Sequence, residues 1–321
     1  MTYNAIDLFC CCGGFSQGIN MSDSGINILA GIDIWNKAIN NYKKNHSHEA
    51  ICEDLQKLPP EIFEKKYNKD NKKIDIIFGS PPCQSYSMSG KRDKNDPRSL
   101  LYLEFVKYVD FYKPKAFMME NVIGLLSIKT NTNEKIIDII LKCFEKDYNC
   151  IVCKLFASDF YVPQNRRRVI IIGIKKELNK IPTEPKPLLT LENRIAVKTI
   201  LTPRDQINEK YFLSKKAIDG IKRRKEVAKS KGNGFGVGIL DMDKPSYTIS
   251  ARYWKDGYDA LVKYDDNKLR RLTIPELKKI QSFPDDYILE GSNKEIITQI
   301  GNAVACTFSK HLGKHLISIL Q

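Results

Sequence analysis

A cysteine follows directly on a short apolar segment of the chain. Residues 74–79 predict a buried strand, and Ser80-Pro81-Pro82-Cys83-Gln84 comes next. The two prolines restrict the backbone and would hold the Cys83 thiol at the end of that strand. A deprotonated thiol in such a place can act as a nucleophile, whereas an isolated cysteine is more often a small buried hydrophobic residue.

A carboxylate stands at the end of the next predicted strand, in Met118-Met119-Glu120-Asn121-Val122. Parallel sheets bind their ligands at the carboxyl ends of the strands, so side chains at neighbouring strand ends act together. Cys83 and Glu120 would then form a pair of nucleophile and acid. Such a pair indicates catalysis rather than packing.

Two arginines precede another apolar strand, in Gln164-Asn165-Arg166-Arg167-Arg168. In a strand, residues 166 and 168 face the same side. Two guanidinium groups directed at one place suit the polarisation of a carbonyl or the binding of a phosphate. A solvated basic turn is the alternative, and the apolar residues that follow make it less favourable.

Three further strand ends outline a pocket for a nucleoside. Asp7-Leu8-Phe9 ends the first predicted strand and leads into Cys10-Cys11-Cys12-Gly13-Gly14-Phe15, where small residues allow a ligand to approach a helix N-terminus. The second strand ends on Asp33, which could accept hydrogen bonds from a ribose diol. The third strand end, Glu53-Asp54-Leu55, could accept a hydrogen bond from an adenine amino group.

These groups require a sheet that brings strand ends together. Strand and helix patterns alternate through the first half of the chain, with strands at 3–9, 26–33, 74–79 and 116–120, helices at 36–44, 100–112 and 134–146, and a hairpin at 149–157 and 169–174. Short apolar strands alternating with helices predict an α/β fold with a doubly wound, mostly parallel sheet covered on both faces.

The character of the sequence changes near residue 181. Prolines cluster at 182, 185 and 187, a basic stretch follows, and four glycines come between 232 and 238. Helical patterns return at 274–282 and 294–320. We therefore expect a first domain at residues 1–180, a smaller domain at 181–291, and a C-terminal helix at 292–321 that returns to the first domain.

Charge is the first indication of a partner. The 321 residues contain 52 Lys and Arg against 38 Asp and Glu, a net charge of +14. Residues 204–231 alone contain ten basic and four acidic residues. This excess favours a polyanion such as nucleic acid, although a solvated helix face explains the basic stretch equally well.

Composition argues against several other classes of protein. Nine cysteines, three of them consecutive, indicate a reducing compartment rather than a disulfide framework. Cys150 and Cys153 lie in an alternating strand pattern and lack a second pair, so no metal site is expected. No apolar run is long enough for a membrane helix, and the N-terminus does not resemble a signal peptide. We expect a cytoplasmic protein that binds no membrane.

In this order, the segments resemble the cytosine-5 DNA methyltransferase family. The resemblance extends from Asp7-Leu8-Phe9 to Gly301-Asn302-Ala303-Val304 and includes Arg271-Leu272-Thr273 with Glu276, then Gln281-Ser282-Phe283-Pro284. It implies a Rossmann-like methyltransferase domain that uses S-adenosylmethionine and releases S-adenosylhomocysteine. The smaller domain at 181–291 would then recognise the target sequence in double-stranded DNA.

The resemblance assigns roles to the residues above. The Cys83 thiolate would add to carbon 6 of a cytosine that is flipped out of the duplex. Glu120 would stabilise the base through its ring nitrogen and amino group, and Arg168 would hold its carbonyl oxygen. Arg166 completes the catalytic set implied by the family.

Two sets of contacts follow from the resemblance. The cofactor would touch Phe9, Gly13, Gly14, Asp33, Ile34, Asp54, Leu55, Pro81, Leu103, Asn302 and Val304. DNA would touch Ser87, Ser89, Lys91, Arg92 and Arg98 in a loop that closes over it, and Thr248, Arg252 and Lys255 in the smaller domain.

One residue departs from the family pattern. Where the family has Phe-x-Gly-x-Gly-Gly, this chain has Cys11 in place of the first glycine. If this position needs a positive φ, a side chain adds strain of about 1 kcal/mol or more. We expect weaker cofactor binding and an intact catalytic mechanism.

Two alternative functions remain open. A tRNA cytosine-5 methyltransferase would share the fold and the chemistry, but the Cys-Phe-Thr segment of those relatives is absent here. A catalytically dead DNA-binding relative would explain Cys11, although Cys83, Glu120, Arg166 and Arg168 are all present. The family favours a monomeric bacterial modification enzyme, paired with a restriction endonuclease that acts on the same site.

Overall fold

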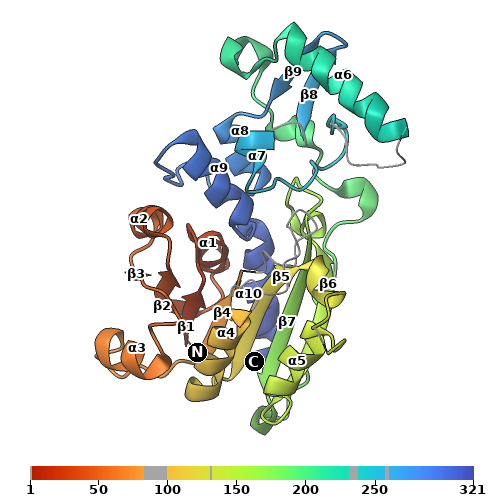
Figure 1. Cartoon of the computed structure of the whole chain (residues 1–321). Coiled ribbons are helices and arrows are strands. Elements are labelled where there is room, and N and C mark those ends of the chain that lie inside the picture. The colour runs from red at the N-terminus through yellow and green to blue at the C-terminus, as the bar shows by residue number, and fades with distance from the viewer. Residues whose placement is uncertain (1, 83–99, 131, 231–237, 257–259) are drawn as a thin grey trace. The chain divides into compact units, whose positions relative to one another are not determined.

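The computed structural model describes residues 2–82, 100–130, 132–230, 238–256 and 260–321. The chain forms two compact units (Figure 1). The first, here the sheet unit, contains Met1–Phe156, Arg167–Pro187 and Val304–Gln321; the second unit contains Ala157–Arg166 and Leu188–Ala303. The units thus divide at other residues than the boundaries at 181 and 292 expected from the sequence.

A seven-stranded sheet forms the centre of the sheet unit, in the order β3-β2-β1-β4-β5-β7-β6 (Figure 1). The strands are β1 (Tyr3–Leu8), β2 (Ile26–Asp33), β3 (Glu49–Cys52), β4 (Ile76–Gly79), β5 (Ala116–Val122), β6 (Tyr148–Phe156) and β7 (Arg167–Lys175). The first five in spatial order pair in parallel, whereas β7 is antiparallel to both β5 and β6. The predicted α/β fold with a mostly parallel sheet is confirmed.

Helices cover both faces of this sheet. They are α1 (Gly14–Met21), α2 (Asn36–Asn45), α3 (Pro60–Tyr67), α4 (Tyr102–Tyr112), α5 (Ile136–Phe144) and α10 (Cys306–Leu320). Ile77 and Phe117 belong to the core that α3, α4 and α5 share. On the opposite face, Phe15 of α1 packs against Phe78 of β4, with ring centroids 4.7 Å apart. Successive strand residues therefore bury opposite faces, as the period of a strand requires.

The C-terminal helical pattern is interrupted. The sequence indicates one helix at 292–321, but the structure has α9 (Asn293–Asn302) in the second unit and α10 in the sheet unit. Ala303 and Ala305 both have extended backbone, which ends one helix before the next begins. Within the sheet unit, α10 packs closely on α1, because a Cβ at Gly18 would lie 2.0 Å from the Cys306 carbonyl oxygen.

The second unit is built around a two-stranded antiparallel sheet, β8 (Leu261–Asp265) and β9 (Lys268–Arg271). Its helices are α6 (Lys215–Ser230), α7 (Tyr253–Asp256), α8 (Ile274–Ile280) and α9, with short 3-10 turns at Leu191–Asn193, Val197–Ile200, Arg204–Gln206 and Glu209–Tyr211. Ile218 and Ile221 of α6 pack on Leu261 and Leu269. The basic helix α6 is therefore attached to this sheet by its apolar side (Figure 1).

Candidate active site

A buried ion pair lies between β5 and β7. The two strands are antiparallel neighbours, and Arg168 of β7 lies opposite Val122 of β5. Val122 is two residues beyond Glu120, so Arg168 and Glu120 are diagonal neighbours. Arg168 Nε lies 2.7 Å from Glu120 Oε1, and the two side chains are only 11% and 9% exposed. Burial lowers the pKa of Arg168, and the charge of Glu120 together with its hydrogen bond opposes that shift. The pair thus presents a fixed acceptor and a fixed cation.

The end of β4 is held against the neighbouring strands. A Cβ at Gly79 would lie 2.2 Å from the Leu8 carbonyl oxygen, so only glycine allows this approach. Asn121 Nδ2 donates to the Pro81 carbonyl over 3.2 Å, and Pro81 is buried. The backbone that leads to Cys83 is therefore attached to the end of β5. Cys83 itself lies outside the described residues.

A turn with unusual backbone follows β1. Three of its residues have positive φ: 60° at Phe9, 50° at Cys11 and 90° at Gly13. This region costs non-glycine residues about 1 kcal/mol or more. Cys11 therefore has the positive φ that was named above as the condition for strain at this position. We call residues 9–13 the β1–α1 turn; Gly13 caps α1, and Gly14 begins it.

Asp33, one of the predicted nucleoside-binding residues, lies beside this turn. The Asp33 carboxylate accepts the Cys11 amide over 2.9 Å and the Trp35 amide over 2.8 Å. Burial raises the pKa of Asp33, and the backbone donors partly offset this effect. Ile34 next to it is 66% exposed, unusual for so apolar a side chain.

The remaining predicted cofactor residues occupy different environments. Phe9, Asp54 and Leu103 are half-buried, Leu55 and Pro81 are buried, Val304 is buried in the sheet unit, and Asn302 is exposed at the end of α9 in the second unit. Phe9 and Ile34 are apolar surfaces that an adenine ring would cover, and Asp33 and Asp54 supply acceptors for polar hydrogens. These four residues of the sheet unit fit an adenosine-containing cofactor.

Arg166 has a different environment from Arg168. It is 3% exposed, and its guanidinium donates to the carbonyls of Gly301 and Ala303 over 3.1 Å and to that of Ile249 over 3.5 Å. The expectation that residues 166 and 168 face one target assumed a continuous strand, but β7 begins at Arg167. Within the second unit, Arg166 holds the backbone on both sides of Asn302.

A pair of buried glutamines supports the same segment, and the sequence did not single them out. Gln164 Nε2 donates to Gln281 Oε1 over 2.5 Å, and Gln281 Nε2 donates to the carbonyls of Ile300 and Ala303. Neither glutamine has any exposed surface. Both stand in motifs quoted above, and that position was the signal by which the sequence could have identified them.

Glu276, quoted above as part of a family motif, has a buried partner in Arg270, the residue that precedes the motif. The two side chains are 0% exposed and form two hydrogen bonds of 2.8 Å. The alternation along β9 buries residue 270 on the side that faces α8. Glu276 also accepts the amides of Thr202 and Thr273, so it connects three segments of the second unit.

Replacing Glu276 by glutamine should destabilise the second unit strongly. The variant leaves the buried Arg270 charge without a counter-charge, which costs about 3–5 kcal/mol when a buried pair is broken. Urea denaturation of the full chain would measure this loss. The exposed Glu209 provides the control, because Glu209→Gln should change stability by no more than about 0.5 kcal/mol. A loss below about 1 kcal/mol for Glu276→Gln would contradict the argument.

The predicted DNA contacts divide into two groups. Ser87, Ser89, Lys91, Arg92 and Arg98 lie outside the described residues. Thr248, Arg252 and Lys255 are exposed in the second unit, where the Thr248 hydroxyl donates to the Asn165 carbonyl over 3.2 Å. The structure thus places the second group on the surface of one unit.

Two kinds of feature are absent from the described part of the chain. No group of three or more His, Cys, Asp or Glu side chains among those residues is arranged to hold a metal ion. None of the helices described there has the length and apolar character needed to cross a membrane.

Comparison with known proteins agrees with this geometry. The family described as C-5 cytosine-specific DNA methylase matches residues 3–318. The chain is 33% identical to the Type II methyltransferase M.SsoII of Shigella sonnei, over 99% of this chain and 81% of that protein. It is 30% identical to the Type II methyltransferase M1.ScrFI of Lactococcus lactis subsp. cremoris, over 99% and 79%.

Solved structures share the fold. The S. pombe Dnmt2 methyltransferase superposes with a TM-score of 0.78 at 18% identity, covering 99% of both chains. A DNA modification methyltransferase encoded within an E. coli prophage gives 0.74 at 23% identity, again over 99% of both chains.

Proposed function

The chain belongs to the C-5 cytosine-specific DNA methylase family and is a DNA cytosine-5-methyltransferase, and from this premise we propose that it acts through a covalent adduct of Cys83 with a flipped-out cytosine. The buried pair of Glu120 and Arg168 carries the proposal. It offers a carboxylate and a guanidinium side by side, which matches the amino group, ring nitrogen and carbonyl oxygen along one edge of cytosine.

The chemistry needs activation of carbon 5, a poor nucleophile in cytosine itself. The Cys83 thiolate adds to carbon 6, forms a C–S bond and moves electron density to carbon 5. Glu120 stabilises the base at its ring nitrogen and amino group, and Arg168 holds the carbonyl oxygen. After methylation, a base removes the carbon-5 proton, the C–S bond breaks, and the thiolate leaves. The ring lies within the duplex stack, so it must first be flipped out.

S-adenosylmethionine supplies the electrophilic methyl group when bound. We place its adenosine part beside the β1–α1 turn, with Phe9 and Ile34 covering the adenine. Asp33 would accept hydrogen bonds from the ribose diol, and Asp54 would accept one from the adenine amino group. The N-terminus of α1, which begins at Gly14, favours a negatively charged group of the ligand nearby. The product is S-adenosylhomocysteine.

Replacing Cys11 by glycine should strengthen cofactor binding. Its φ of 50° disfavours a side chain, and glycine removes that strain as well as the bulk beside the methionine part of the cofactor. We expect the dissociation constant for S-adenosylmethionine, measured by calorimetry, to fall about threefold to tenfold.

Asp23 offers a matched control for that substitution. It is an exposed residue with a φ of 48° outside the turn. Asp23→Gly should therefore relieve similar strain without changing cofactor affinity. A Cys11→Gly variant that binds no more tightly than the parent protein would rule out the role assigned to Cys11.

The named relatives suggest the biological setting. Both are called Type II methyltransferases. We propose that this enzyme protects bacterial DNA, as a monomer in the cytoplasm, against a restriction endonuclease that recognises the same sequence. The exposed Thr248, Arg252 and Lys255 of the second unit are proposed contacts to that sequence.

One experiment tests the proposed function directly. Purified protein is incubated with labelled S-adenosylmethionine and either unmethylated genomic DNA or total tRNA, and 5-methylcytosine is mapped at base resolution. Label at one short recurring DNA sequence supports the proposal and identifies the target. Label on tRNA alone would show that the substrate is tRNA rather than DNA. Label on neither nucleic acid would contradict the proposed activity.

A further inference from the structure

A chain of hydrogen bonds runs beneath the β1–α1 turn. Asp7 Oδ2 accepts the Ser16 hydroxyl over 2.6 Å, Ser16 Oγ lies 2.8 Å from the Tyr42 hydroxyl, and that hydroxyl lies 2.6 Å from His48 Nε2. Asp7, Ser16 and Tyr42 have at most 1% of their surface exposed. The chain therefore joins the end of β1 to α1 and α2 through buried polar atoms.

A second connection reaches the same turn through His46. Its ring stacks on His48 with centroids 5.0 Å apart and donates a hydrogen bond to the Gly13 carbonyl. His46 Nδ1 lies 3.3 Å from the Asn20 side-chain amide. The two connections thus hold both ends of the turn, since Asp7 precedes it and Gly13 ends it.

We propose that Tyr42 and His46 are positioning residues for S-adenosylmethionine, which hold the β1–α1 turn in the conformation that the cofactor requires. This inference rests on the proposed function. Neither residue belongs to the segments that resemble the family, and neither needs to touch the cofactor.

The strain in the turn explains why such support is needed. Phe9 and Cys11 both have positive φ, and strained residues persist only where their surroundings hold them. Hydrogen bonds of backbone amides within the sheet unit also fix the turn: the Cys10 amide donates to Ile32, that of Cys11 to Asp33, and that of Gly13 to Cys10. The hydrogen bonds of Tyr42 in α2, and of His46 and His48 in the segment after α2, add further support.

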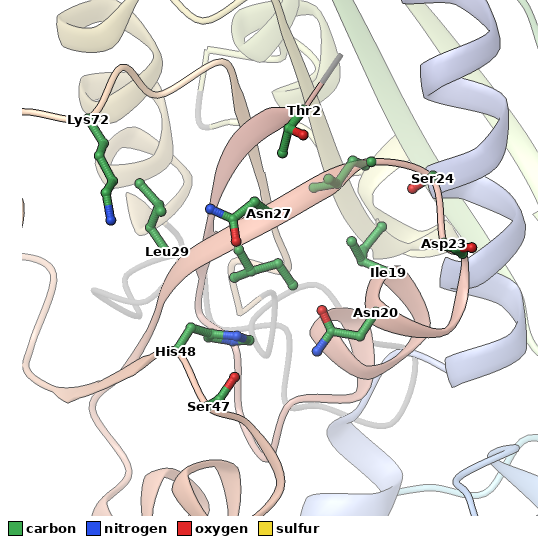
Figure 2. A pocket seen from close by; sticks show the side chains of 13 residues that line it. Thr2, Ile19, Asn20, Asp23, Ser24, Asn27, Leu29, Ser47, His48 and Lys72 are labelled. Atoms are coloured by element: carbon green, nitrogen blue, oxygen red, sulfur yellow. The ribbon is translucent and has the colours of Figure 1, made fainter.

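Space for this arrangement is built into β2. A Cβ at Gly31 would lie 2.3 Å from the Tyr42 ring, so glycine lets the ring reach Ser16. At its other end the chain meets a cavity of about 650 Å³ that is lined by His48, Ser47, Asn20 and Asn27 among others. Figure 2 shows the His48 ring directed into this cavity.

The protonation states indicate that the side chains in this chain of hydrogen bonds are uncharged near neutral pH. Burial lowers the pKa of His48 to about 4 and that of His46 to about 3, with His48 adding to the shift of His46. Burial also raises the pKa of Asp7 to about 8; the Ser16 hydroxyl opposes this shift and Asp33 adds to it. Neutral groups of this kind can be buried at moderate cost when they are hydrogen-bonded.

Tyr42→Phe tests the proposal, because it removes the hydroxyl that links Ser16 to His48 and keeps the ring. We expect the dissociation constant for S-adenosylmethionine, measured by calorimetry without DNA, to rise about fivefold to tenfold. The Michaelis constant for the cofactor should rise in parallel, while kcat at saturating cofactor changes less than twofold. Ser16→Ala breaks the same chain without altering the ring and should give the same result.

Tyr108→Phe is the matched control. Tyr108 is equally buried in the sheet unit, and its hydroxyl donates to the Leu58 carbonyl over 2.8 Å. This variant should lose comparable stability and keep its cofactor affinity within twofold. For His46, glutamine retains an N–H donor and should preserve affinity better than leucine does.

The outcomes separate this inference from the proposed function. Equal affinities for folded Tyr42→Phe, Ser16→Ala and Tyr108→Phe variants would overturn the positioning role alone. A fall in kcat without any change in cofactor affinity would also overturn it. Failure of the unaltered protein to bind S-adenosylmethionine would overturn the proposed function, and this inference with it.

Discussion

Replacing Cys83 by serine is expected to abolish methyl transfer while DNA and S-adenosylmethionine still bind. A serine hydroxyl is not ionised near neutral pH and is a far weaker nucleophile than a thiolate. The carbon-6 adduct would then not form, and carbon 5 would remain unactivated. We expect kcat to fall by at least about a thousandfold. Transfer of label from the cofactor to DNA measures the rate, and calorimetry measures binding.

Cys143 provides the control for this experiment. It is exposed on α5 and is not among the residues proposed to act in the reaction. Cys143→Ser should retain the activity of the parent protein. Turnover by Cys83→Ser within about tenfold of the parent would contradict a covalent mechanism, and a parent protein without turnover would indicate a DNA-binding relative that has lost activity.

The strand ends were the most predictable part of this molecule. Short apolar runs fall on β1, β2, β4 and β5, and the rule for parallel sheets brings their carboxyl ends together. The approach of Arg168 to Glu120 did not follow from the residues alone. It depends on the antiparallel pairing of β7 with β5, which a run of apolar residues does not reveal.

Predictions that depended on the start of an element or on tertiary partners were less successful. Arg166 was assigned to a strand that begins one residue later, and its guanidinium donates to three backbone carbonyls of the second unit. The buried pair of Arg270 and Glu276 was not predicted at all, because the quoted motif begins one residue later, at Arg271. Helical periodicity continues through α9 and α10, and the extended backbone at Ala303 and Ala305 separates the two helices.

Asp7 shows how burial changes the meaning of a motif residue. In the sequence it marks the end of a strand and has no evident role of its own. In the structure it is 1% exposed, and its Oδ1 has no hydrogen-bond partner among the described residues. The charged form of such a carboxyl is strongly disfavoured.

Replacing Asp7 by asparagine should therefore stabilise the protein increasingly as pH rises. Burial raises the pKa of Asp7 to about 8, from an ordinary value of 3.8. Between these values the folded state keeps a proton that the unfolded state has lost, so raising the pH favours unfolding. Asparagine binds no proton and removes this dependence. Between pH 5 and pH 8 we expect the stability of the variant relative to the parent to increase by about 4 kcal/mol.

Comparison of the two proteins isolates Asp7 from its titrating neighbours. Asp33, His46 and His48 are present in both proteins, so their contributions to the pH dependence cancel in the difference; burial lowers the pKa of the two histidines in the folded protein to about 3 and 4. Urea denaturation of each protein at several pH values gives the difference directly. An Asp7 that was ionised in the folded state from pH 5 upward would leave the difference constant, because both states would then hold the same charge. A rising difference instead requires that the carboxyl beneath the β1–α1 turn be buried as a neutral acid.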